Sequence, residues 1–567
     1  MMKKRIIALV LLLCLLPGVF SLSSCKKKKP KNDPVDQGTA ATTDRWEILG
    51  PEIAAALDAN ARTFKIECAD FNTTAKISRN KKYLKGPDSL TGADSIDLMI
   101  YERNNRACQL LGTTIEYEFW DDDKGAWGVS SNEINTLVQA NNPDAPDLFV
   151  NQIYDLNKAM LTFGVFKDVK SLPGSYFDFS AEGWMADWME SMSFTGDRAY
   201  VLAGDYFLDV LRSMGVLPFN TKLMDENGDK LAAALFGAGN GLTAGETMSN
   251  RFFDYVEDGN WTWDSLKKLS EAIYVDSDGD GQKSIGDLLG IVADCYGGVC
   301  TALYLYSSAE DAALIERKPN DAQGGKMWAY LPAESTAFGE IFDAVASVFN
   351  GDGALATYKE VEDTTEGLAG HRLKFARDQL LFAGYALIGD LEDDAFKQMT
   401  STSLWSVVPL PKVSADKKYN TFVYDTADAG AINVRTSPEK ARAISAYLQY
   451  CTEHSANIRE EFLTIVTKFK TTEYNQGTSR MLDLIYESVY YGGAKVIDGA
   501  IWAETNRAQQ RWYDYMKDAR CVLTAGDFVD KYQSARDAKQ AKLDEIMLKW
   551  YNLPTAETEA AAESAAE

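Results

Sequence analysis

The chain has 567 residues, which is too long for one hydrophobic core and predicts two to four domains. Its hydrophobic content of 46% and charged content of 25% are those of an ordinary globular protein. A formal net charge of −25 repels phosphate backbones, which argues against nucleic acid as a partner. The two histidines, His371 and His454, lie far apart in the sequence and argue against a histidine-based zinc site.

The N-terminus indicates export. The start MMKKR is basic, and the apolar run that follows it is too short to span a bilayer. Leu22-Ser23-Ser24-Cys25 then resembles the lipobox of bacterial lipoproteins, in which cleavage precedes an acylated cysteine. The alternative is an ordinary secretory signal. We expect residues 1–24 to be removed and Cys25 to hold the protein on the outer face of the cytoplasmic membrane, with the lysines at 26–29 against anionic headgroups.

The two ends of the mature chain are polar. Residues 25–60 predict a flexible tether, and the acidic stretch 553–567 predicts a disordered tail. Six further cysteines are scattered without a CxxC motif. Export permits a bond between Cys295 and Cys300, although small buried thiols are the favoured interpretation.

Strand-like and helix-like stretches alternate along the chain. TFKIECADF, TTIEYEF and DLFV read as strands, and SIDLMIYERNNRACQLLG has helical spacing of its apolar residues. Ser437 predicts a helix N-cap, with Pro438 at the first helical position. This alternation predicts an α/β protein of two lobes with mostly parallel sheets, in which ligands bind at the carboxyl ends of strands.

One acidic loop suggests a metal site. Residues 275–287 read VDSDGDGQKSIGD, with a helix capped by Thr262 before them and the strand-like run DLLGIVADC after them. Calcium takes six to eight oxygen ligands, and the spacing resembles an EF-hand loop with Gly281 at its sharp turn. The predicted ligands are Asp276, Asp278, Asp280, the backbone carbonyl of Gln282, Ser284 and Asp287.

This loop departs from the EF-hand pattern. Asp287 stands where EF-hands carry a longer glutamate, and Lys283 replaces an apolar residue. A solvated Asp/Gly turn is the alternative. We expect a structural Ca²⁺, because the carboxylates of the loop would fill the coordination of the ion and leave no position for catalysis.

Several stretches in fixed order resemble one family. WTWD at 261–264, the amphipathic helix, the DxDGDG loop and the strand that carries Gly290 resemble the family 1 extracellular solute-binding proteins, which are lipid-anchored receptors of ABC importers. The stretches 101–104, 146–150, 155–169, 194–205 and 407–412 also match, so the resemblance spans roughly residues 60–550.

The resemblance implies two α/β lobes around a ligand cleft. Crossing segments are expected near 204–207, between 411 and 428, and near 475–485. Lobe one would be 61–204 with 415–475, and lobe two would be 205–414 with 476–552. The resemblance further implies a mono- or oligosaccharide as ligand and an ABC permease as partner, and we expect a monomer.

The candidate ligand contacts follow from position. Sugar sites combine aromatic rings, which cover C–H faces, with amides and carboxylates, which pair with hydroxyls. We predict contacts from Asn151, Gln152, Asp205, Tyr206, Tyr296, Tyr385, Tyr424 and Asp425. The alternatives are loop capping for the two amides, a hinge role for Asp205 and Tyr206, and packing for the tyrosines. We interpret Trp261 and Trp263 as packing residues.

A secreted enzyme and a surface adhesin are the two alternative classes of function. No GxSxG, HExxH, P-loop or Cys/His pair stands out, and carboxylate pairs arise by chance in so acidic a chain. These absences argue against a secreted glycan-active enzyme. A surface adhesin is a third class, but calcium-binding adhesion modules of the dockerin type carry two such loops.

Overall fold

The computed structural model describes a large but discontinuous part of the chain. The described residues are 44–70, 81–125, 128–192, 198–294, 304, 307–308, 315–320, 325–330, 336–357, 374–392, 405–468, 476–490, 541, 544–546 and 548–549. The chain divides into two compact units, Met1–Glu47 and Ile48–Glu567, and both main sheets belong to the second unit. Among the described residues, no helix has the length and apolar character needed to cross a membrane.

The first sheet combines strands from both ends of the chain. Its order is β13 (Asp428–Ile432), β3 (Leu148–Gln152), β1 (Thr63–Ala69) and β2 (Thr114–Trp120). The central strand β1 runs parallel to β2 and β3, whereas β13 is antiparallel to β3. All five residues of β3 are buried, as expected for a strand that is covered on both faces.

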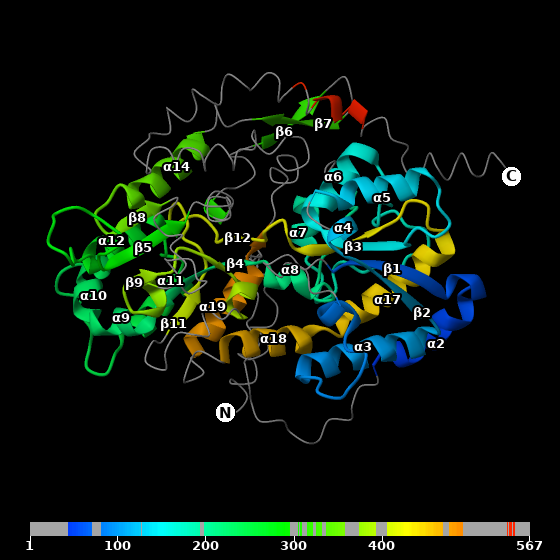
Figure 1. The fold of residues 1–567 in the computed structure, drawn as a ribbon, viewed down its shortest axis with the longest axis horizontal. Helices are drawn as coiled ribbons and strands as arrows, with labels where there is room; N and C mark the ends of the chain where they lie inside the picture. The colour runs from blue at the N-terminus through cyan, green and yellow to red at the C-terminus, as the bar shows by residue number, and fades with distance from the viewer. Residues whose placement is uncertain are drawn as a thin grey trace, which may run out of the picture. The chain divides into compact units, whose positions relative to one another are not determined.

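Helices cover both faces of this sheet. α6 (Ile153–Phe163) lies against β3 and β13, and α17 (Pro438–Glu453) lies against β1 on the opposite side (Figure 1). α17 begins as predicted, because the Ser437 hydroxyl accepts from the Lys440 N–H and Pro438 follows it. The other elements near the first sheet are α2 (Trp46–Ala56), η1 (Ala59–Ala61), η2 (Lys81–Lys85), α3 (Ser95–Leu111), α4 (Asp122–Gly125), α5 (Ser130–Gln139), α7 (Ala186–Ser191) and α18 (Ala456–Lys468).

The second sheet is built from the middle of the chain. Its order is β10 (Ala386–Leu387), β4 (Gly215–Asn220), β9 (Leu380–Phe382), β5 (Leu289–Asp294) and β8 (Ala354–Thr357), with β11 (Trp405–Val408) also paired to β4. β5 is parallel to β8 and β9, and β4 is antiparallel to β9, β10 and β11. The predicted α/β class with parallel strands is confirmed. Each sheet also has an antiparallel strand that follows a segment from the other sheet, namely β13 in the first sheet and β4 in the second.

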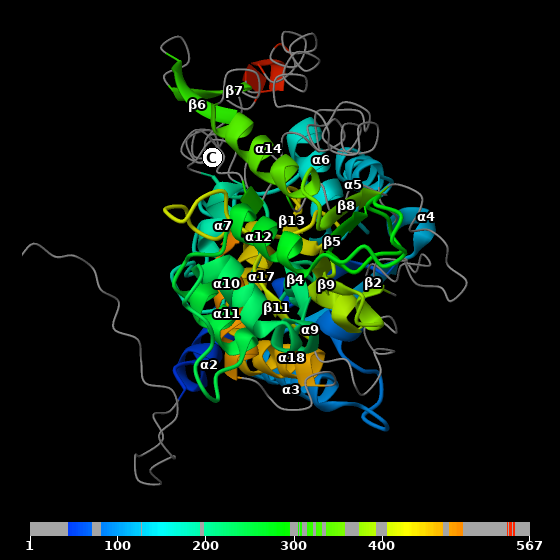
Figure 2. The ribbon, with the colours of Figure 1, turned by 90° about the vertical axis from the view of Figure 1, so that its left-hand side faces the viewer.

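The helix that follows WTWD packs closely on the second sheet. α12 (Trp263–Ile273) begins at the Thr262 cap and contacts β5, α10 (Gly228–Phe236) and α14 (Thr336–Phe349); α10, α11 (Met248–Glu257) and α12 lie against one another in Figure 2. The Trp261 ring stacks on Phe382 with centroids 5.6 Å apart, and Trp263 is fully buried. Both tryptophans are therefore packing residues, as predicted. The remaining elements are α9 (Thr221–Glu226), β6 (Ile315–Asn320), β7 (Gly325–Tyr330), η5 (Ile388–Glu392) and α19 (Gln476–Glu487).

Three chain segments run side by side where the chain passes between the two sheets. The first contains α8 (Leu208–Arg212) and Met214, which forms an antiparallel bridge to Val423. The second contains β12 (Thr421–Phe422) and leads into β13. The third, β14 (Val489–Tyr490), pairs in parallel with β12 and lies just beyond the predicted stretch 475–485. We call these three the linking segments.

The predicted tether is wrong over part of its length. Residues 25–60 include the helix α2, and both Ile53 on it and Leu57 directly after it are buried. These two residues are spaced i, i+4 in an alanine-rich stretch, which is the spacing of a buried helical face. The average composition of the whole segment is polar because of the residues before position 44, so composition alone does not reveal the helical spacing of Ile53 and Leu57. Residues 1–43 and the tail 553–567 lie outside the described residues.

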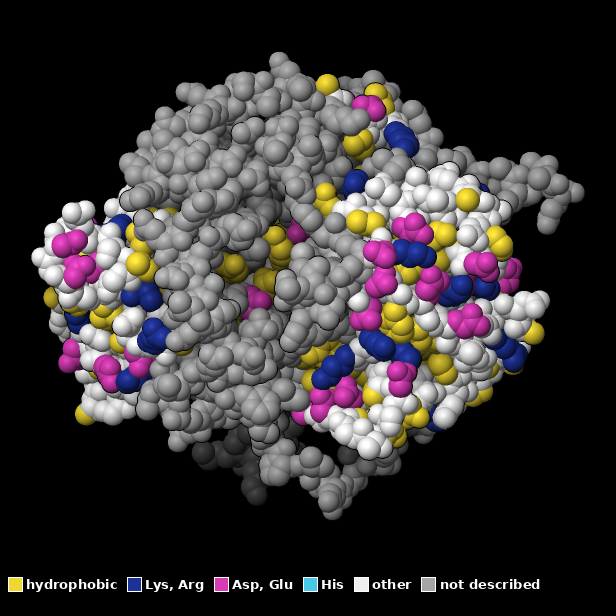
Figure 3. All heavy atoms as spheres, viewed as in Figure 1, with side chains coloured by type: hydrophobic (Ala, Val, Ile, Leu, Met, Phe, Trp, Pro, Cys, Tyr) yellow, Lys and Arg dark blue, Asp and Glu magenta, His cyan; other side chains and the backbone are white. Residues whose placement is uncertain are grey.

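The described surface is of mixed charge. On the described part of the face in Figure 3, Lys and Arg side chains are interspersed with Asp and Glu. That part therefore carries no broad basic surface of the kind that nucleic acid needs. Among the described cysteines, Cys68 and Cys451 are buried free thiols and Cys108 is a half-buried one, whereas Cys295 and Cys300 lie outside the described residues.

Candidate functional site

The two amides predicted at the end of β3 lie in a buried polar cluster. Asn151 and Gln152 are the last two residues of the strand and are fully buried. The Asn151 side chain donates to Glu67 on β1 over 3.1 Å, and its oxygen accepts from the Gln152 N–H over 2.8 Å. The side-chain amide of Gln152 has no hydrogen-bond partner among the described residues. The cluster lies at the carboxyl end of the sheet, where α/β proteins place their ligands.

The second linking segment meets this strand end. The Ile153 N–H donates to Ala427 O over 2.8 Å, and the Tyr154 N–H donates to Asp425 O over 3.0 Å. The Tyr424 N–H donates to Ser213 O in the first linking segment over 2.9 Å. The structure therefore brings four of the predicted contacts, namely Asn151, Gln152, Tyr424 and Asp425, to one edge of the first sheet.

Glu67 was not predicted from the sequence. It lies in the middle of β1, and burial raises the pKa of its carboxyl well above the usual range, although the Asn151 hydrogen bond opposes this shift. Burial therefore favours the protonated form of Glu67. In TFKIECADF the alternation suggests a solvated glutamate, but helices cover both faces of this sheet, so alternation does not separate inside from outside.

An ion pair in the first linking segment was also missed. Asp209 and Arg212 on α8 form a buried ion pair, and the guanidinium of Arg212 lies 5.5 Å from the ring centre of Tyr83. Asp209 also accepts from the Asp428 N–H over 3.0 Å, which ties α8 to β13. The i, i+3 spacing of opposite charges in LDVLR was the available signal.

Asp205 bridges three segments. It is 4% exposed, and it accepts from Arg459 on α18 and from the Tyr486 hydroxyl on α19 over 2.7 Å. Arg459 also donates to the Tyr486 oxygen over 3.0 Å, which closes the network. Burial raises the pKa of Asp205 to about 6, while the charge of Arg459 and the Tyr486 hydrogen bond oppose this shift. We call Asp205, Arg459 and Tyr486 the Asp205 network.

The predicted tyrosines have different surroundings. Tyr206 is fully buried, with its ring centre 4.8 Å from the Arg103 guanidinium and 5.8 Å from the Tyr447 ring. These contacts fit the packing alternative. Tyr385 is also buried, in the turn between β9 and β10. Tyr296 lies outside the described residues, and the ligand contacts of all eight predicted residues stay a prediction.

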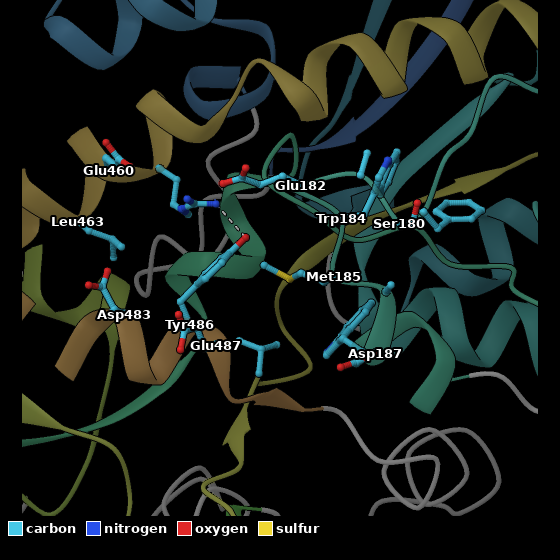
Figure 4. A pocket seen from close by; sticks show the side chains of 17 residues that line it. Ser180, Glu182, Trp184, Met185, Asp187, Glu460, Leu463, Asp483, Tyr486 and Glu487 are labelled. Atoms are coloured by element: carbon cyan, nitrogen blue, oxygen red, sulfur yellow. Dashed lines mark hydrogen bonds between the residues drawn. The ribbon is translucent and has the colours of Figure 1, made fainter. Parts of the chain in front are cut away.

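A pocket of about 550 Å³ opens beside the Asp205 network. Residues 179–188 form one wall, and the other walls come from α18 and from the end of α19 (Figure 4). The lining residues outside 179–188 are Arg459, Glu460, Leu463, Asp483, Tyr486, Glu487 and Val489. None of the predicted ligand contacts lines this pocket, so it is separate from the cluster at the end of β3. The sequence offered no signal for it, because its walls come from three distant segments.

The acidic loop is closed by backbone and carboxylate hydrogen bonds. Val275 and Leu288 exchange two backbone hydrogen bonds of 3.1 Å at its base. Asp276 accepts from the N–H groups of Gly279 and Gly281, both over 2.8 Å, and the bond from Gly281 contributes most to holding its pKa below the usual value. Gly281 has a φ of +73°, which only glycine adopts easily, as the predicted sharp turn requires.

Three of the four carboxylates among the predicted calcium ligands converge. One carboxylate oxygen each of Asp276, Asp278 and Asp287 lie within 4.8 Å of one another. The carboxylate of Asp280 instead accepts from the Gln282 N–H over 2.7 Å, and the Ser284 hydroxyl accepts from the Gly286 N–H over 3.0 Å. Three close carboxylates suit a hard cation that prefers oxygen ligands.

The chain was compared with known families and structures. No protein-family model matches it. No curated protein sequence matches it either. Solved structures to which it is similar include ABC transporter solute-binding proteins.

Three of these structures illustrate the similarity. An ABC transporter solute-binding protein from Thermotoga lettingae TMO, bound with alpha-D-tagatose, is 12% identical, with 85% of this chain and 100% of that chain covered and a TM-score of 0.42. An ABC transporter associated binding protein from B. animalis subsp. lactis Bl-04, in complex with beta-1,6-galactobiose, is 12% identical, with coverage of 85% and 98% and a TM-score of 0.43. A family 1 extracellular solute-binding protein from Bifidobacterium longum subsp. infantis is 14% identical, with coverage of 85% and 99% and a TM-score of 0.42.

Proposed function

We propose that the protein is a lipid-anchored solute-binding protein of an ABC importer, which captures a mono- or oligosaccharide and passes it unchanged to a membrane permease. The observation that carries the proposal is the arrangement of the three linking segments. They are hydrogen-bonded side by side through Met214 with Val423 and through β12 with β14. The first leads to β4, the second leads from β11 to β13, and the third follows α19, which contacts β11. Two lobes on such a hinge can open and close around a ligand.

The lobes of the proposed receptor follow the linking segments. Lobe one consists of residues 61–204 and 415–475, and lobe two consists of residues 205–414 and 476–552. The solute lies between them at the carboxyl end of β3, and it stabilises the closed form because it contacts both lobes. Asn151, Gln152 and Asp425 supply hydrogen bonds to hydroxyls, and Tyr424 supplies an aromatic face. Lipidated Cys25 keeps the receptor beside its permease.

Calorimetry against a panel of mono- and oligosaccharides tests this function. We expect saturable binding of at least one sugar, with a smaller radius of gyration in solution scattering when the sugar is bound. The sugar recovered afterwards is expected to be chemically unchanged. Binding of peptides with silence across the sugar panel would refute the carbohydrate assignment, and release of new reducing ends would indicate an enzyme instead of a receptor.

We also propose that the acidic loop holds a structural Ca²⁺. The converging oxygens of Asp276, Asp278 and Asp287 support this assignment, and the remaining ligands would come from backbone carbonyls or water. The loop connects α12 to β5, so an ion bound there would brace the second sheet. A bound cation also relieves the repulsion between the three carboxylates.

Removal of calcium is expected to lower the thermal stability of the protein. An ion at 100 times its Kd adds about 2.7 kcal/mol to the free energy of unfolding, which corresponds to a Tm rise of several degrees. We expect Asp278→Asn to lose most of this rise, whereas Asp264→Asn on the exposed face of α12 keeps it. The measurement is the Tm in excess Ca²⁺ and in EDTA. Equal values for the native chain in both conditions would favour the solvated turn.

A further inference from the structure

Carboxylates outnumber cations in the lining of the pocket beside the Asp205 network. Five carboxylates line it, those of Glu182, Asp187, Glu460, Asp483 and Glu487, against one cation, Arg459. Arg459 is already paired with Asp205, which is not itself a lining residue. No described Lys or Arg lies within ion-pair distance of Glu182, Asp187, Glu460 or Glu487. The pocket therefore holds a negative potential that an occupant can neutralise.

The wall of the pocket is apolar between these carboxylates. Met185, Leu463 and Val489 contribute aliphatic surface, and Phe179 and Tyr486 contribute aromatic surface. In Figure 4 the Met185 side chain lies between Glu182 and Asp187, and the Tyr486 ring lies on the other side of Met185 from Asp187. One face of the Tyr486 ring is covered by the guanidinium of Arg459, 4.4 Å from the ring centre. A cation therefore already lies against this ring, in the arrangement of a cation–π contact.

We propose that this pocket binds a small aliphatic organic cation with more than one ammonium group. The exposed carboxylates of Glu182, Asp187, Glu460, Asp483 and Glu487 form the rim of the pocket. Ammonium groups pair with these carboxylates, and the hydrocarbon between the ammonium groups covers the apolar wall. A volume of about 550 Å³ lies within the range of small-molecule sites. Neutral sugars would leave the rim charge uncompensated, and anions would be repelled. The site is separate from the sugar site proposed above, so either can exist without the other.

Titration of the whole protein with butane-1,4-diammonium chloride tests the proposal. At low ionic strength we expect saturable binding by calorimetry, with affinity falling steeply between 10 and 150 mM salt because the rim charges are exposed. Butane-1,4-diol is expected not to bind, since it has the same body without charge. Ethane-1,2-diammonium is expected to bind more weakly, because it covers less of the apolar wall.

Variants separate this pocket from diffuse attraction by an acidic protein. Glu182→Gln combined with Glu487→Gln removes two exposed rim charges and is expected to weaken diammonium binding about ten-fold. Glu102→Gln on the exposed face of α3 changes the net charge by one unit and is expected to leave the affinity unaltered. The proposal is overturned if the diol binds equally, if no saturable binding is seen, or if the double variant binds as tightly as the native chain.

Discussion

Replacing Arg459 with alanine is expected to lower the free energy of unfolding by about 3 kcal/mol at neutral pH. The reason is that Asp205, 2% exposed at its side chain, would lose the cation that compensates its charge. The Tyr486 hydroxyl would remain as its main donor, and one neutral donor does not replace a charge. Chemical denaturation followed by tryptophan fluorescence measures the loss.

Arg480 on α19 provides the matched control. It pairs with Asp254 and Glu257 on α11, but its side chain is 38% exposed. Exposed pairs contribute about 0–1 kcal/mol, so Arg480→Ala is expected to cost far less than Arg459→Ala. Equal costs for the two variants would mean that burial of the Asp205 network does not matter.

The pH dependence of the same network gives a second readout. Because the pKa of Asp205 is raised to about 6 in the folded chain, against about 3.9 when unfolded, its contribution to stability is full below pH 4 and is lost as the pH rises through 6. Compared with Asp205→Asn, the native chain is expected to lose about 1.3 kcal/mol between pH 5 and pH 7. The cost of Arg459→Ala is expected to shrink toward pH 5, where neutral Asp205 no longer needs a cation. A cost that is independent of pH would contradict this account.

Replacing Gly353 with alanine is expected to cost about 3 kcal/mol. A Cβ atom at this position would lie 1.8 Å from the carbonyl oxygen of Ser270 on α12 and 2.1 Å from its carbonyl carbon. Gly353 also accepts the Gly290 N–H over 2.7 Å, so it cannot move away without breaking the contact between β5 and the turn before β8. The helix would have to shift off the second sheet, which urea unfolding and the fluorescence of Trp263 would report.

Two further variants make this prediction specific. Gly241→Ala is the control, because the nearest atom to its Cβ is an Asp229 oxygen at 3.9 Å and the residue is exposed. Ser270→Gly is expected not to rescue Gly353→Ala, since the clash is with backbone atoms that every residue has. Rescue by Ser270→Gly, or a cost for Gly353→Ala below about 0.5 kcal/mol, would show that the close approach of α12 is not required.

The helices and strands could be predicted where their signals are local. Ser437 and Thr262 cap helices as expected, because an N-cap needs only its own side chain and the next three residues. DLFV could be placed as a buried strand from its apolar run, although the strand continues through Asn151 and Gln152. The helix α2 was missed because composition averaged over 25–60 outweighed the spacing of two apolar residues.

The candidate sites divide in a similar way. The acidic loop could be found because its carboxylates are neighbours in the sequence, and the structure brings the carboxylates of Asp276, Asp278 and Asp287 together. Asp205 could be selected by its position after YVLAG, but its partners Arg459 and Tyr486 stand 254 and 281 residues away. A single sequence does not indicate which distant arginine pairs with a given carboxylate. The Asp205 network and the pocket beside it could therefore not be predicted.

Local order along this chain was enough to indicate an α/β protein with an acidic loop, since caps, turns and apolar spacing act over a few residues. Which strands pair, and in which direction, depended on contacts between segments far apart, such as β12 with β14. The charges that meet at Asp205 and around its pocket were likewise decided by folding alone. The energies of these charge interactions depend on burial and on distances between side chains, and the order of the residues gives neither quantity.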